Sequence, residues 1–267
     1  MLKDITLGQY FPGNTVIHRL DPRTKLILVV AYIVALFSAK SLFSYLLVAF
    51  FLFAVIKLST IRVKIILKGL KPLILIIALT GILNLFYTAG RPLVQFWIFT
   101  ITVEGVINAI FMVTRIILLI AGTFMLTYTT SPIALTDGLE KLLGPLKKIK
   151  VPVHELAMMM CIALRFIPTL IEETDKIMSA QKARGADFET GNLIARAKAL
   201  IPILVPLFIS AFRRADELAI AMECRCYQGG KGRTRMKQLR FESRDTWAFL
   251  LGAAMVAGVF VLRSLGL

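Results

Sequence analysis

The chain has 267 residues, of which 57% are hydrophobic, with a mean hydropathy of +0.77 and a formal net charge of +16 at pH 7. Soluble domains are about 45–50% apolar, so the composition argues against an ordinary globular enzyme. A nucleic-acid-binding protein could be this basic but would not be this apolar, and no nucleic-acid partner is expected. An apolar and basic chain is typical of a multi-pass membrane protein with a positive cytoplasmic face. Three cysteines are too few for a disulfide framework.

The first 24 residues are not expected to be a signal peptide, because they lack a short apolar core and a small-residue cleavage site. They contain turn-forming residues at Pro12-Gly13-Asn14 and Asp21-Pro22 instead. This pattern predicts a loop on the membrane surface.

Five apolar segments approach the roughly 20 residues that a membrane-spanning helix needs. Two short ones share the stretch from Lys25 to Lys57 and are separated by Ser38-Ala39-Lys40-Ser41. The other three are expected at about Pro72–Tyr87, Val106–Tyr128 and Thr246–Leu262.

The charge distribution predicts the orientation of these spans. Residues 1–71 hold ten Lys and Arg against two acids, and five of the bases lie within 57–71. Residues 88–105 carry only Arg91 and Glu104. The positive-inside rule therefore places 57–71 in the cytoplasm and 88–105 outside. With five spans, the segment between the fourth and the fifth is cytoplasmic and the C-terminus is outside.

That cytoplasmic segment is expected to be helical and amphipathic. We therefore expect the chain to have three regions: a loop and four-helix transmembrane region at 1–130, a coupling-helix region at 131–244 and a last transmembrane helix at 245–267. After one short helix, two long helices are expected at about 153–188 and 193–227, with Pro168, Pro202 and Pro206 bending them. The fold class is thus all-α: a polytopic membrane protein with about five transmembrane helices and two long amphipathic cytoplasmic coupling helices.

Each long helix has one apolar face at i, i+3, i+4 and i+7 spacing. The first face holds Ile167, Leu170, Ile171, Thr174, Ile177, Met178 and Gln181, and the second holds Leu204, Leu207, Phe208, Ala211, Ala215, Leu218 and Met222. The opposite faces are expected to hold Glu172, Glu173, Asp175, Lys176, Arg213, Arg214, Asp216 and Glu217. These helices have more apolar surface than a solvated pair would need.

A weak internal repeat relates the two long helices. At an offset of 41 residues, the matched pairs are Asp175 with Asp216, Ala180 with Ala221, and Arg184 with Arg225. Each helix therefore ends on an arginine flanked by small residues, Ala183-Arg184-Gly185 in the first and Cys224-Arg225-Cys226 in the second.

Motifs for catalysis and cofactor binding fail at specific positions. His154-Glu155-Leu156-Ala157-Met158 has Met158 where a zinc-protease helix needs its second histidine. Gly230-Lys231 is followed by Gly232 where a phosphate-binding loop needs Ser or Thr. We therefore expect no bound metal, no cofactor and no catalytic residue.

Arg115, inside the fourth span, has several interpretations. An ionisable residue in a span is a functional candidate. It could equally pair with Glu104, extend toward the membrane surface, or indicate that the span lies elsewhere in the sequence. The sequence leaves these alternatives open.

The chain resembles the energizing transmembrane component (T-component) of energy-coupling factor transporters, the family of the cobalt-transport membrane subunit. The resemblance covers nearly the whole chain. It depends on His18-Arg19-Leu20-Asp21-Pro22-Arg23-Thr24-Lys25, Leu164-Arg165-Phe166-Ile167-Pro168, Ala183-Arg184-Gly185, Arg213-Arg214-Ala215-Asp216 and Ala221-Met222-Glu223-Cys224-Arg225. The second arginine motif departs from the family's Ala-Arg-Gly/Ser, because cysteines flank Arg225.

The resemblance implies a non-catalytic scaffold in the bacterial or archaeal plasma membrane. It would join two cytoplasmic ABC-type ATPases to a small substrate-binding membrane protein, the S-component, which captures a vitamin or metal ion. The resemblance also implies that the coupling helices cross and that their arginine-bearing ends, Ala183-Arg184-Gly185 and Cys224-Arg225-Cys226, dock on the two ATPases. Membrane lipid is the remaining partner expected.

Two other functions are weighed against this one. A membrane-embedded lipid or prenyl transferase would need an acidic or histidine cluster, for which Glu172, Glu173 and Asp175 are the candidates. A secondary carrier would need polar residues in several spans, and the spans offer little beyond Arg115 and Asn84. Co-purifying ATPase chains would separate the transporter from both alternatives.

Overall fold

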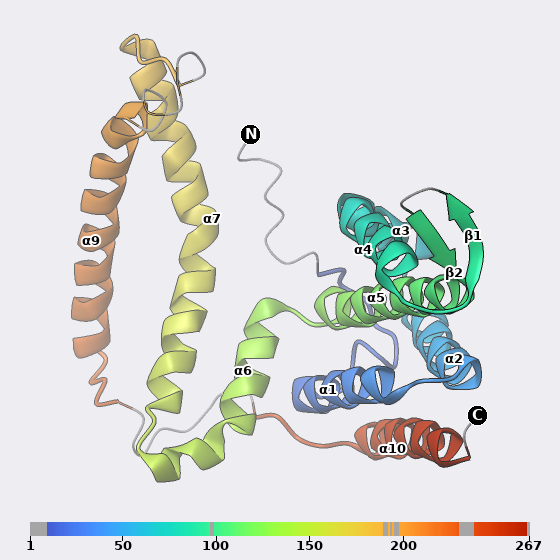
Figure 1. Cartoon of the computed structure of the whole chain (residues 1–267). Helices are drawn as coiled ribbons and strands as arrows, with labels where there is room; N and C mark the ends of the chain where they lie inside the picture. The colour runs from blue at the N-terminus through green and yellow to red at the C-terminus, as the bar shows by residue number, and fades with distance from the viewer. Residues whose placement is uncertain are drawn as a thin grey trace. The chain divides into compact units, whose positions relative to one another are not determined.

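The computed structural model describes residues 10–96, 99–188, 198–229 and 238–265, together with residues 192 and 194. Its described residues divide into two compact units. The first, called the bundle unit, comprises the described parts of 10–139 and 239–265, and the second, called the paired-helix unit, comprises those of 140–238. Figure 1 shows the helices of each unit.

The bundle unit is mainly helical, as the all-α prediction requires. Its elements are α1 (Pro22–Ser38), α2 (Leu42–Ser59), α3 (Val63–Leu70), the 3₁₀ helix Lys71–Leu73, α4 (Ile74–Tyr87), α5 (Val103–Thr129) and α10 (Ser243–Ser264). A short antiparallel hairpin of β1 (Pro92–Phe96) and β2 (Phe99–Thr102), which the sequence analysis did not predict, lies between α4 and α5. Helix α6 (Pro132–Leu142) runs across the boundary between the two units.

Among the residues that the structure describes, five helical segments are long and apolar enough to cross a membrane, as predicted, but they are not the same five. Four match predicted spans: α2, the continuous segment Val63–Tyr87, α5 and α10. Helix α1, with 17 residues, is shorter than these segments, whereas α7 (Val153–Ala183) is the fifth. Helix α7 is apolar enough because only its second half carries the charged run around Glu172–Lys176.

Helix α1 begins at Asp21-Pro22, which the sequence analysis took for a turn. The Asp21 side chain accepts a hydrogen bond from the backbone N–H of Arg23, and Pro22 occupies the first turn of the helix. An acidic N-cap followed by proline is a helix start, because the cap satisfies a free N–H and proline lacks one. Helix α10 begins similarly, with a capping box between Glu242 and Asp245.

Buried polar groups join the first and last helices of the bundle in what we call the polar junction, defined as Asp21, Arg23, Lys25, Thr129 and Asp245. The Lys25 Nζ donates to the backbone oxygens of Thr129 (2.8 Å) and His18 (3.2 Å) and to the Thr130 hydroxyl (3.1 Å). The Asp245 carboxylate accepts from the backbone N–H of Asp21 at 2.9 Å. Arg23 donates to the Asp21 carboxylate and to the Leu239 carbonyl. The junction therefore ties the starts of α1 and α10 to the end of α5.

The loop before α1 is held through His18. Its Nε2 donates to the Phe11 carbonyl at 3.1 Å, so Nδ1 is left to accept from the Thr15 hydroxyl at 2.6 Å. Burial lowers the pKa of His18 below its usual 6.5, so the ring is neutral at pH 7 and can make both bonds.

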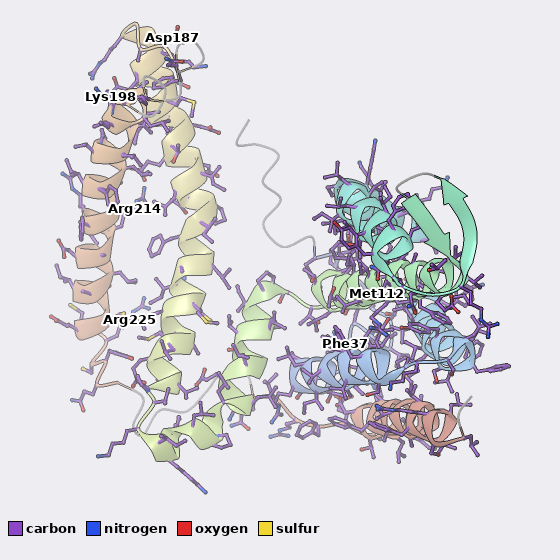
Figure 2. The ribbon with its side chains drawn as sticks, viewed as in Figure 1. Phe37, Met112, Asp187, Lys198, Arg214 and Arg225 are labelled. Atoms are coloured by element: carbon purple, nitrogen blue, oxygen red, sulfur yellow. The ribbon has the colours of Figure 1, made fainter. Side chains whose placement is uncertain are left out.

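Arg115 is held inside the bundle by the turn between α1 and α2. Its guanidinium donates to the Tyr45 hydroxyl at 2.8 Å and to the Ala39 carbonyl, at the end of α1, at 3.3 Å. It also lies near the Phe37 ring, which Figure 2 labels together with Met112 of α5. The expected alternative partner, Glu104, instead accepts from the backbone N–H of Arg91. Arg115 therefore has a structural role, satisfying a carbonyl that the helix end leaves free.

The core of the bundle lies where α1, α2, α5 and α10 meet. Leu36, Val48 and Val259 are fully buried there, and Tyr32 donates from its hydroxyl to the Leu118 carbonyl. Helix α10 approaches its neighbours at two glycines: an added Cβ would lie 2.3 Å from Leu28 at Gly252 and 3.2 Å from Leu47 at Gly258. Small residues permit such close helix packing in membranes.

Two expected helices have other boundaries. The predicted helix 153–188 ends at Ala183, because the chain turns at Arg184-Gly185. The predicted helix 193–227 is represented by α9 (Ile201–Glu223), which begins with Pro202 in its first turn. Part of its expected N-terminal stretch lies outside the described residues.

Replacing Lys25 with methionine is expected to destabilise the bundle. The change removes a donor and leaves two buried acceptors, the Thr129 carbonyl and the Thr130 hydroxyl, each of which costs roughly 1–3 kcal/mol when unsatisfied. We expect a melting temperature lowered by about 5 °C or more for the protein in mild detergent. The matched control is Lys40→Met, at an exposed lysine between α1 and α2. Equal melting temperatures for the two variants would contradict the role given to Lys25.

Candidate functional site: the arginine-bearing helix ends

Helices α7 and α9 form an antiparallel pair in the paired-helix unit (Figure 1). Near one end of the pair, Gln181 of α7 donates to the Pro202 carbonyl of α9 at 3.3 Å. Toward the other end, Ile162 and Phe166 of α7 line a small apolar cavity with Leu218 and Met222 of α9. The order of these contacts shows that the end of α7 lies beside the beginning of α9.

The packed face of α7 is the predicted one, but that of α9 is rotated. All seven residues predicted for the face of α7 are at least partly buried. On α9, Leu204 and Phe208 were expected on the face and are 46% and 60% exposed. Ile203 and Arg214 lie in the packed stripe instead.

An ion pair lies between the helices, where the sequence analysis expected both partners on solvent-facing sides. Arg214 of α9 donates to the Glu173 carboxylate of α7 at 3.0 Å, and Ser210 donates to the same carboxylate. Glu173 and Arg214 are related by the 41-residue offset of the internal repeat. Helical periodicity alone indicates a solvent-facing position for both residues, so the pair could not be predicted from it.

The end of α7 places Arg184 in a tight turn. The backbone N–H of Gly185 donates to the Lys182 carbonyl and that of Ala186 to the Gln181 carbonyl, both at 3.0 Å. Gly185 has a φ of +89°, in the left-handed region, and nothing lies within 4 Å of the position a Cβ would take. A left-handed residue closing a helix end in this way satisfies the last carbonyls. Ala183, Arg184 and Gly185 are all exposed.

The end of α9 repeats this turn at an offset of 41 residues. Cys226 donates to the Glu223 carbonyl at 2.8 Å and Tyr227 to the Met222 carbonyl at 3.0 Å. Cys226 has a φ of +54°, so it takes the left-handed conformation of Gly185 although it carries a side chain. The cysteines therefore leave the backbone turn unchanged, and Cys224, Arg225 and Cys226 are exposed.

The two exposed arginines lie at opposite ends of the pair. Arg225 lies two residues after the end of α9, and Lys198 lies three residues before its start; Figure 2 labels both, with Arg214 between them. Because α9 has 23 residues, its ends are about 34 Å apart at roughly 1.5 Å per residue. Guanidinium groups suit bidentate contact with a carboxylate. The arrangement can therefore present two such contacts on separate surfaces.

Other candidate residues make contacts within the protein. The His154 Nδ1 lies 3.0 Å from the Glu140 carboxylate. Of the acidic residues considered for a transferase, Glu173 accepts hydrogen bonds from Arg214 and Ser210. Among the residues that the structure describes, no three His, Cys, Asp or Glu side chains are grouped as a metal site.

The fold and the apolar helices define a multi-pass helical protein of the cell membrane. Residues 13–236 match the family model described as "Cobalt transport protein" (CbiQ), and the chain belongs to this family. Relatives named "Energy-coupling factor transporter transmembrane protein EcfT" are similar over almost the full chain. That of Thermosediminibacter oceani is 57% identical over 98% of this chain and 99% of its own, and that of Clostridium kluyveri 57% over 96% of each. That of Bacillus subtilis is 47% identical over 99% of this chain and all of its own.

The resemblance found in the sequence is therefore confirmed: this chain is a transmembrane component of an energy-coupling factor transporter. Because the relatives are transporter membrane components, a non-enzymatic role in transport is indicated.

The left-handed turns predict opposite effects of glycine at the two helix ends. Gly185→Ala puts a side chain into the left-handed region, which costs about 1 kcal/mol or more. Cys226→Gly relieves the same strain. Hydrogen exchange should be about fivefold faster at 183–186 in the first variant and slower at 224–227 in the second. Cys224→Gly is the control, because Cys224 has an ordinary helical φ of −59° and should gain nothing. Slower exchange in this control than in Cys226→Gly would exclude the strain at Cys226.

Proposed function

We propose that the chain is the non-catalytic coupling subunit of its transporter. It links ATP hydrolysis by two cytoplasmic ABC-type ATPases to the uptake of a vitamin or metal ion that a separate S-component captures. The ATPases would dock on the exposed ends Ala183-Arg184-Gly185 and Cys224-Arg225-Cys226. The observation that carries this proposal is the repeated turn, which presents an arginine in the same backbone setting at each end.

Two equivalent ends suit two equivalent partners. The three donor–acceptor pairs that form the turn after α7 recur after α9, each at the same offset of 41 residues. Cys226 adopts the left-handed backbone conformation, which is disfavoured by about 1–2 kcal/mol for a residue with a side chain. A helix end that only faces water does not require this conformation. A shared docking geometry on two homologous ATPases supplies a reason to keep it.

The proposal includes the division of the chain at 1–130, 131–244 and 245–267, with 131–244 in the cytoplasm. The excess of Lys and Arg in residues 1–71 and the scarcity of charge in residues 88–105 support this orientation. In this arrangement, α7 is a coupling helix rather than a span. Its charged second half, around Glu172–Lys176, is costly to place in hydrocarbon.

Single-cysteine labelling tests the orientation. In a background without Cys161, Cys224 and Cys226, an impermeant thiol reagent added to intact cells should label Arg91→Cys and should not label Lys141→Cys. Both sites are exposed, so access to the reagent differs only by the side of the membrane. Permeabilised cells, in which both variants should react, are the control. Labelling of position 141 from outside would overturn the orientation.

Charge reversal tests the docking. Each arginine is expected to meet a carboxylate in a partly desolvated groove, where removing one partner costs about 2–5 kcal/mol. The remaining contact is on the same scaffold, so its effective concentration stays high. Arg184→Glu or Arg225→Glu should thus leave a weakened complex with poor transport, and the double variant should release both ATPases, as measured by co-purification.

Arg213→Glu is the matched control for this experiment, because it reverses an exposed charge in the middle of α9. It should co-purify with the ATPases at the normal yield. If the double variant also did so and transported normally, the docking role of the two arginines would be wrong. Co-purifying ATPases likewise separate a transporter from a lipid or prenyl transferase, which needs none.

A further inference from the structure

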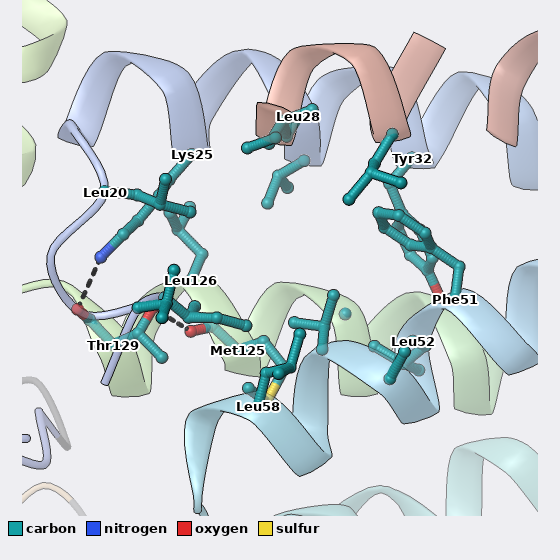
Figure 3. A pocket seen from close by; sticks show the side chains of 18 of the residues that line it. Leu20, Lys25, Leu28, Tyr32, Phe51, Leu52, Leu58, Met125, Leu126 and Thr129 are labelled. Carbon is teal, nitrogen blue, oxygen red and sulfur yellow. Dashed lines mark hydrogen bonds between the residues drawn. The ribbon is translucent and has the colours of Figure 1, made fainter. Parts of the chain in front are cut away.

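The bundle unit contains an apolar cavity of about 360 Å³. Its walls come from the loop before α1, the first half of α1, the second half of α2, the end of α5 and the beginning of α10. Figure 3 shows Leu28 and Tyr32 of α1, Leu58 of α2, and Met125 and Leu126 of α5 around it.

Water is a poor occupant of this cavity. A buried water needs two to four polar partners, and two polar side chains at the wall, Lys25 and Tyr32, already make hydrogen bonds within the protein. The Lys25 ammonium donates to three acceptors, and the Tyr32 hydroxyl donates to the Leu118 carbonyl at 2.8 Å. An apolar cavity of about 150 Å³ stays dry and binds benzene. A cavity more than twice that size, with similar walls, is suited to a longer hydrocarbon.

The cavity lies beside the lipid-facing surface of the bundle. Phe50 of α2 and Leu251 of α10 line it and are 75% and 60% exposed, so they also belong to the outer surface. In a multi-pass membrane protein, the hydrocarbon available on such a surface is an acyl chain of the bilayer. An acyl chain can therefore enter the cavity from this surface without any separation of the core helices.

The rim of the cavity carries positive charge and an interfacial aromatic side chain. Arg244 and Trp247, both in the first turns of α10, line the cavity, and Trp247 is 68% exposed. Tryptophan is enriched where a bilayer meets water. Arg244 is paired with Glu242 at 2.9 Å, but both side chains are largely exposed, and such pairs contribute only about 0–1 kcal/mol. The guanidinium is therefore available to a stronger anionic partner.

The same rim lies at the basic end of the bundle. The starts of α1 and α10 carry Arg19, Arg23, Lys25 and Arg244 against the acids Asp21, Glu242 and Asp245. Basic ends lie on the cytoplasmic side, where the leaflet is rich in anionic lipids.

We propose that this cavity binds one acyl chain of an anionic phospholipid of the cytoplasmic leaflet, with the phosphodiester held by Arg244. The lipid would lie against α1, α2, α5 and α10 together, so its binding stabilises the bundle by an amount that rises with the logarithm of the lipid concentration. The site is independent of ATPase docking, so each proposal can fail without the other.

The test uses the full chain, purified in mild detergent and stripped of lipid. Phosphatidylglycerol or phosphatidylcholine with the same acyl chains is added back, and native mass spectrometry and melting temperature are measured. The wild type should retain phosphatidylglycerol at least about fivefold better and melt at a higher temperature with it. Ala248→Phe, which fills the cavity from α10, should abolish retention of both lipids. Arg244→Gln should still bind lipid but lose the preference.

Two controls lie on the same helix. Ala254→Phe adds the same ring at an exposed position outside the cavity, and Arg263→Gln removes a charge from the opposite end of α10. Both should bind lipid like the wild type. If Ala248→Phe does not give a monodisperse protein, Ala54→Leu fills the cavity from α2. Unchanged retention in the filled variant, or equal affinity of the wild type for the two lipids, would overturn the proposal.

Discussion

The bundle unit depends on burying a charged ammonium where the first and last helices meet. Lys25 is only 6% exposed. Its ammonium group donates to oxygens of His18, Thr129 and Thr130, and among the described residues it makes no direct ion pair with a carboxylate. Such a group is stable only when all its donors are satisfied. The backbone around it is therefore fixed in three places at once. The neighbouring Asp21 and Asp245 complete the constraint, since one caps α1 and the other binds its cap.

This constraint also fixes where the chain returns to the bundle. The bundle unit resumes at Leu239, whose carbonyl accepts from Arg23. The returning chain is thus bound at the polar junction where it enters the bundle.

The parts of the structure predicted from sequence are those set by local patterns. Apolar runs identified α2, α4, α5 and α10, and the arginine motifs marked the ends of α7 and α9. The rest depends on contacts between distant residues. Nothing local shows that Arg115 binds the Ala39 carbonyl, that Asp245 binds the start of α1, or that Asp21-Pro22 begins a helix rather than a turn. The left-handed φ of Cys226 could likewise not be predicted from the sequence, because such a turn is usually recognised by a glycine at this position.

The Glu173–Arg214 pair gives the paired helices one register. Apolar stripes alone allow two antiparallel helices to slide by a turn, about 5.4 Å, at little cost. The Arg214 and Glu173 side chains are 37% and 21% exposed, so separating them costs up to about 1 kcal/mol, and a slid pair is disfavoured by about that amount. The register matters because it sets the distance between Arg184, which follows α7, and Arg225, which follows α9. In the docking proposed above, this distance decides whether two separate partners can bind at once. The ion pair thus favours one spacing of the two arginines, even though its net contribution to stability is small.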